Sequence, residues 1–80
     1  MTVVLATSSA LPELSQDDQL LYRALQASGI PVEIAVWDDP AVDWSQYELC
    51  VIRSTWDYVP KREQYVAWAN HVASQTQLWN

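Results

Sequence analysis

The sequence predicts a small three-layer α/β domain, in which a parallel sheet with strand order 2-1-3-4 carries helices on its faces. Two short runs, at residues 2–6 and 48–53, have continuously apolar centres, which is typical of central strands buried on both faces. A third run, at residues 31–37, has branched apolar side chains at every second position, which favours a place nearer the sheet edge. Segments with helical periodicity separate these runs, and this alternation indicates a parallel sheet.

The first strand is followed by a loop and then by a helix, expected over residues 16–28, with signals at both ends. Ser15 suits the N-cap, Asp17 places negative charge in the first turn, and Asp18 stands where a capping box has its acid. Gly29 is the only glycine and stands where a helix favours a left-handed residue after its end. The stripe expected to face the sheet repeats at helical spacing and comprises Asp17, Leu20, Leu21, Ala24, Leu25 and Ser28.

The remaining elements continue the alternation. Pro31 opens the edge strand, where its missing N–H does least harm, and residues 43–47 suit a short helical turn before the third strand. Pro60 suits the first turn of a second helix that reaches about Ala73, and the last strand starts near Leu78. The apolar positions that repeat along the second helix are Tyr65, Trp68, Ala69 and Val72.

Composition narrows the class of protein. Eighty residues suit one domain, and half of them are apolar, which excludes a disordered chain. The net charge is −6 with only four cations, which argues against nucleic acid as a partner. One cysteine provides no disulfide framework and favours a cytoplasmic protein, and no apolar run is long enough to span a membrane. Because the apolar pair Leu78 and Trp79 has no turn signal after it, we expect residues 1–80 to be a fragment or one domain of a longer chain.

Polar side chains follow the third strand at once, and they form the first candidate for a ligand site. They are Arg53, Ser54, Thr55, Trp56, Asp57 and Tyr58. In open α/β sheets, ligands bind outside the carboxyl ends of the strands, where the loops after the strands open on one edge. The same argument makes Thr7 and Ser8 after the first strand, and Asp38 and Asp39 after the second, secondary candidates for loop contacts.

A purely structural role for these residues stays open. Arg53 could simply pair with Asp57, and Trp56 could fill the core, because structural ion pairs are common. Trp44 and Trp56 are the tryptophans expected in loops, so they are the ones that could face a ligand or a partner.

Other chemistries lack the residue types that they need. A dinucleotide site or a P-loop requires glycines after the first strand, and residues 7–14 contain none. Cys50 lies within a buried strand, where a thiol behaves as a small apolar side chain, and one cysteine with the single His71 cannot form a structural zinc site. The acidic loop after the second strand suits solvent better than a hard cation; its carboxylates are Asp38, Asp39 and Asp43.

Several segments together resemble a known family. The pattern WDDP…VDW…Y…IRSTWDY…W is spread over the part of the chain from residue 36 to residue 80. Its residues are 36–40, 42–44, Tyr47, 52–58 and 78–80. This pattern resembles the N-terminal domain of RimK-like ATP-grasp proteins, in particular the group that contains the ligase closing the D-cycloserine ring. In that family the segment is a small Rossmann-like pre-ATP-grasp domain with a parallel sheet.

The resemblance implies a function for the parent protein rather than for this piece alone. The family joins a carboxylate to an amine or a similar nucleophile with ATP and Mg²⁺ through an acyl-phosphate. The lysines and the metal-binding Glu and Asn residues that hold these cofactors lie in two later domains, so none is assigned to this sequence. The chain would then be a substrate-side domain without catalysis of its own, and its partners would be the remaining ATP-grasp domains and a small-molecule substrate.

Within this family assignment, the loop after the third strand would contact substrate. Arg53 would bind a substrate carboxylate with its planar guanidinium, and Ser54 and Thr55 would add hydroxyl hydrogen bonds. Asp57 would hold Arg53 or receive a substrate amine.

Two other classes of function compete with this one. A non-catalytic α/β module could bind a protein partner or form a homodimer through exposed tryptophans. A flavodoxin-like or response-regulator-like domain is weaker, although Asp17 and Asp18 resemble an acidic phosphoacceptor pocket. Such receivers need an aspartate at the end of the third strand, where this chain has Arg53 and Ser54.

Overall fold

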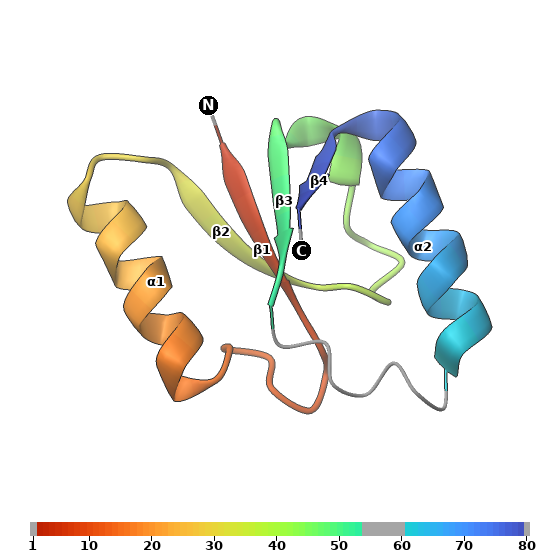
Figure 1. The fold of residues 1–80 in the computed structure, drawn as a ribbon, viewed down its shortest axis with the longest axis horizontal. Helices are drawn as coiled ribbons and strands as arrows, with labels where there is room; N and C mark the ends of the chain where they lie inside the picture. The colour runs from red at the N-terminus through yellow and green to blue at the C-terminus, as the bar shows by residue number, and fades with distance from the viewer. Residues whose placement is uncertain (1, 54–60, 80) are drawn as a thin grey trace.

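The computed structural model describes residues 2–53 and 61–79, and within them it has the predicted architecture of a parallel sheet between two helices (Figure 1). The strands pair in the predicted order, β2-β1-β3-β4, and every pairing is parallel. Their bounds are Val3–Thr7 for β1, Val32–Val36 for β2, Leu49–Ile52 for β3 and Gln77–Trp79 for β4. The helices are α1 at Gln16–Ala27, α2 at Arg62–Gln75 and the short 3-10 helix η1 at Trp44–Gln46.

The observed bounds lie within about two residues of those expected wherever both ends are described, as is usual for element ends. α2 ends at Gln75, two residues beyond the expected Ala73, and β4 begins one residue before Leu78. Pro60, the expected start of α2, lies outside the described residues.

Both ends of α1 are capped as the sequence predicts. The side chain of Ser15 accepts a hydrogen bond from the backbone N–H of Asp18 at 3.3 Å. At the other end, Gly29 has a φ of 79°, and the N–H of Ile30 donates to the carbonyl of Leu25 at 3.1 Å. This is a Schellman motif, in which glycine takes the left-handed position without a steric penalty.

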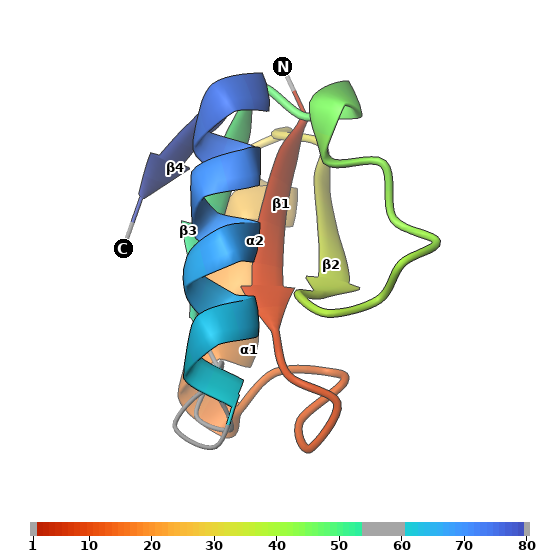
Figure 2. The same ribbon diagram turned by 90° about the vertical axis from the view of Figure 1, so that its right-hand side faces the viewer.

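Alternate strand residues build one apolar layer on each face of the sheet. Figure 2 shows α2 in front of the sheet and α1 behind it, and all five residues of β1 are buried between them. The layer under α1 contains Val3, Leu5 and Leu14, with half-buried Leu21, Tyr22, Leu25, Ile30, Val32, Ile34, Leu49 and Val51. The layer under α2 contains Val4, Ala6, Trp37, Trp44, Tyr47, Cys50, Trp68 and Val72.

The stripe predicted for α1 is only partly right. Leu21 and Leu25 pack toward the sheet as expected, whereas Leu20 is 64% exposed. The residues of α1 that face the sheet are instead those at positions 18, 21, 22 and 25. Asp18 belongs to this set because its carboxylate points inward and pairs with Arg53.

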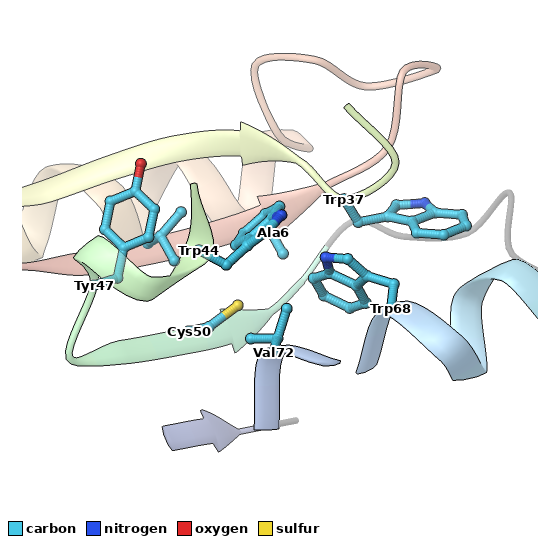
Figure 3. Close-up of a cluster of buried hydrophobic side chains, with 8 residues drawn as sticks. Ala6, Trp37, Trp44, Tyr47, Cys50, Trp68 and Val72 are labelled. Atoms are coloured by element: carbon cyan, nitrogen blue, oxygen red, sulfur yellow. The ribbon is translucent and has the colours of Figure 1, made fainter. Parts of the chain in front are cut away.

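Three tryptophans form the centre of the layer under α2 (Figure 3). Trp68 from α2 meets Trp37 and Trp44 edge to face, with ring centroids 5.8 and 5.3 Å apart. Trp44, which the sequence places in a loop, is buried and only 4% exposed. The reason is tertiary: η1 packs against α2 and turns the indole of Trp44 onto the ring of Trp68.

Candidate functional site

The carboxyl ends of the first three strands meet at one edge of the sheet, as expected for parallel strands. The N–H of Arg53 donates to the carbonyl of Ala6 at 3.0 Å, and the N–H of Trp37 donates to the carbonyl of Thr7 at 2.9 Å. These two bonds extend the ladder one residue beyond β3 and β2. They place the residues that follow the three strands side by side, with Arg53 at this edge.

Arg53 forms an ion pair with Asp18 in the first turn of α1. The Nε and Nη2 atoms of Arg53 both lie 2.7 Å from Oδ1 of Asp18. The Asp18 side chain is only 7% exposed, whereas that of Arg53 is 40% exposed. The pair therefore buries its carboxylate and leaves the guanidinium in contact with solvent.

Sequence reasoning missed Asp18 as a partner of Arg53. The sequence predicts a capping-box role for Asp18 and indicates Asp57 as the acid that pairs with Arg53. The helical spacing does indicate that Asp18 faces inward, because it lies three, four and seven positions before Leu21, Tyr22 and Leu25, which pack toward the sheet. Asp57 lies outside the described residues, so its predicted role is untested.

A cavity of about 430 Å³ opens beside this ion pair. Its lining residues are Ser15, Gln16, Asp17, Asp18 and Arg53. The first turn of α1 contributes a helix N-terminus, which favours negative charge, and Arg53 contributes a planar donor group suited to a carboxylate. Among the described residues, no hydrogen bond uses Nη1 of Arg53, which lies on the edge of the guanidinium opposite Nε. The cavity thus places the guanidinium of Arg53 beside the acidic residues Asp17 and Asp18.

The secondary candidates after β1 have different surroundings. The hydroxyl of Thr7 donates to the carbonyl of Leu11 at 2.6 Å, which ties the strand to its own loop. Ser8 is completely buried, and its hydroxyl has no hydrogen-bond partner among the described residues.

The acidic loop after β2 stands apart from the Arg53 cavity and holds its carboxylates in separate contacts. Asp38 pairs with Nζ of Lys61 at 3.0 Å, and Asp39 accepts the N–H of Ala41 at 2.9 Å. The side-chain and backbone hydrogen bonds from Ser45 lower the pKa of Asp43. Within residues 2–53 and 61–79, no three His, Cys, Asp or Glu side chains converge on a metal position. These carboxylates therefore do not fit a Mg²⁺ site.

A second cavity, of about 320 Å³, lies between this acidic loop and α2. Trp37, Trp44 and Trp68 contribute to its walls, with His71 on the side of α2. It is a different place from the cavity beside Arg53, so the secondary candidates Asp38 and Asp39 do not share a pocket with Arg53.

The rest of the predicted site lies outside the described residues. This holds for Ser54, Thr55, Trp56, Asp57 and Tyr58, whose substrate contacts remain predictions. No helix in the described part of the chain is both long and apolar enough to cross a membrane.

Comparisons with known proteins agree on one family. Residues 3–80 match the family model described as the N-terminal domain of D-cycloserine synthetase DcsG. The chain is 30% identical over 76 residues to the cycloserine biosynthesis protein DcsG of Streptomyces lavendulae, a match that covers 95% of this chain and 25% of that protein. A crystal structure of D-cycloserine synthetase DcsG superposes with a TM-score of 0.89 and 29% identity, covering 98% of this chain and 26% of that one. The chain spans about a quarter of the length of these relatives.

The burial of Cys50 predicts an inert thiol. Desolvation raises the pKa of Cys50 to about 12, so the thiol stays protonated at neutral and mildly alkaline pH. We expect iodoacetamide at pH 8 to label the native chain far more slowly than the chain unfolded in urea, with mass spectrometry as the readout. Equal labelling rates in the two states would contradict this placement of Cys50.

The ion pair predicts a specific stability pattern. Arg53→Ala leaves the carboxylate of Asp18 buried without its cation, and we expect the free energy of unfolding to fall by roughly 1–3 kcal/mol. The double variant Arg53→Ala, Asp18→Asn removes the buried charge and should regain most of that loss in urea denaturation. The pairing would be unimportant if Arg53→Ala cost no more than Arg23→Ala, which removes an exposed cation from α1.

Proposed function

The chain belongs to the family of the N-terminal domain of D-cycloserine synthetase DcsG, and from this membership we propose that it is the substrate-side domain of an ATP-grasp carboxylate–amine ligase. The family resemblance inferred from the sequence motifs is confirmed by the match over residues 3–80. On this proposal the chain is the N-terminal domain of a longer cytoplasmic protein and has no catalysis of its own.

One observation carries the proposal: an arginine held at the carboxyl edge of a parallel sheet, beside a cavity. Arg53 is 40% exposed on the side chain and lines the cavity of about 430 Å³. Ligands of open α/β sheets bind at this edge, and a guanidinium suits the planar carboxylate of a small substrate. The relatives are described as a synthetase of D-cycloserine and a cycloserine biosynthesis protein, and we infer a small carboxylate-bearing substrate for the parent of this chain as well.

We assign the cofactors of the proposed reaction to other parts of the parent protein. ATP would activate a carboxylate as an acyl-phosphate, and Mg²⁺ would neutralise the negative charge of the phosphates of ATP. The described carboxylates of this chain are held in separate contacts and offer no converging set for Mg²⁺. The part of this chain in the proposed reaction is therefore to bind and orient the substrate.

A kinetic test follows from the role of Arg53. In the full-length parent, Arg53→Ala should raise KM for the carboxylate substrate by at least about tenfold, because a charge-assisted pair is lost. The value of kcat should change much less. Arg23→Ala is the matched control, and circular dichroism establishes that each variant is folded at the assay temperature. Unchanged KM in a folded Arg53→Ala variant would exclude this substrate role.

An apolar strip, formed by exposed Trp79 of β4 and half-buried Val51 of β3, favours a partner on the face of the sheet opposite α2. Trp79 of β4 is 59% exposed and lies in register with Val51 of β3, so both side chains point to the α1 face. α1 itself lies on the β2 side of the sheet, away from β4 (Figure 1). Because the chain spans only 26% of its solved relative, we propose that the remaining part of the parent covers this strip.

Footprinting tests what covers Trp79. Hydroxyl-radical oxidation of Trp79, quantified by mass spectrometry, should be several-fold slower in the full-length parent than in the 80-residue chain. An equal rate in both would contradict the proposal. A rate that falls with increasing concentration of the 80-residue chain, to the level seen in the parent, would assign the strip to a homodimer instead.

A further inference from the structure

We propose that Asp18 is a positioning residue, which holds the guanidinium of Arg53 in the orientation that binds a substrate carboxylate. This inference rests on the proposed function and adds to it a residue from a different element of the fold. Asp18 belongs to the first turn of α1, and Arg53 follows β3, 35 positions later in the sequence.

Within the described part of the chain, Asp18 contacts one edge of the Arg53 guanidinium, and no residue forms a hydrogen bond with the other edge. Nε and Nη2 of Arg53 lie 2.7 Å from the same oxygen, Oδ1 of Asp18. A guanidinium is planar and carries five donors in a fixed fork, so a contact on one edge fixes the direction of the other. The edge formed by Nη1 and the outer proton of Nη2 is then the one available to a carboxylate.

Asp18 is itself held firmly enough to do this. Its side chain is 7% exposed, and its backbone N–H donates to the hydroxyl of Ser15 at the helix N-cap. A side chain fixed by burial and by its own backbone can hold a flexible neighbour. Free arginine has many rotamers, and restricting them before binding reduces the entropy lost when a ligand arrives.

The sign of the effect separates positioning from simple electrostatics. Asp18 is negative, so removing its charge makes the surroundings of Arg53 more positive. If only net charge mattered, a carboxylate would bind more tightly without Asp18. If Asp18 acts by orienting Arg53, a carboxylate binds more weakly without it.

Two substitutions of Asp18 in the full-length parent test this. Asp18→Ala removes both the charge and the acceptor oxygen, and it should raise KM for the carboxylate substrate roughly fivefold with little change in kcat. Asp18→Asn keeps an acceptor oxygen near the same place and should restore part of the loss. Glu63→Gln, which removes an exposed acid from the first turn of α2, is the control for net charge. A KM that falls in both Asp18 variants would overturn the inference.

A double-mutant cycle distinguishes positioning from a structural role. If Asp18 acts through Arg53, then Asp18→Ala added to Arg53→Ala should cause no further rise in KM. Additive effects in the cycle would overturn the inference. The proposed function has its own point of failure, an unchanged KM in Arg53→Ala, so a failure of the proposal and a failure of the inference give different results.

Discussion

The ion pair between Asp18 and Arg53 is the contact on which the candidate site depends. A buried carboxylate is costly unless a cation and hydrogen bonds replace the water that it loses, and Arg53 meets this need with two donors. The pair joins the end of β3 to the start of α1 across the edge of the sheet. It leaves Arg53 partly exposed beside a cavity. The same arginine side chain can therefore stabilise the fold through Asp18 and present donors to a ligand.

The two faces of the sheet differ in the side chains that cover them. Under α2, Trp37, Trp44 and Trp68 pack edge to face, and large aromatic rings provide much buried area in a chain of eighty residues. On the α1 side, the layer is mostly aliphatic and includes no residue of β4, where Trp79 is exposed. The packed face can stabilise the domain, while the α1 side at β4 is the part that we assign to the rest of the parent protein.

Local and periodic features were predictable from the sequence. The strand order follows from the apolar runs and the handedness of crossovers, and Ser15 and Gly29 mark the ends of α1 by their chemistry. Contacts between distant residues were not predictable in the same way. The predicted stripe has Asp17 rather than Asp18 facing the sheet, and Asp18 faces inward because it pairs with Arg53, 35 positions away in the sequence. Trp44 was placed in a loop, and only its packing against α2 buries it.

A structure of the full-length parent with its carboxylate substrate bound would test the central claim most directly. The account predicts that a substrate carboxylate oxygen lies within hydrogen-bonding distance, about 3 Å, of Nη1 of Arg53, while Oδ1 of Asp18 still contacts Nε. A substrate bound elsewhere in the parent, with no atom in contact with Arg53, would contradict it. In that case the ion pair would serve the fold alone.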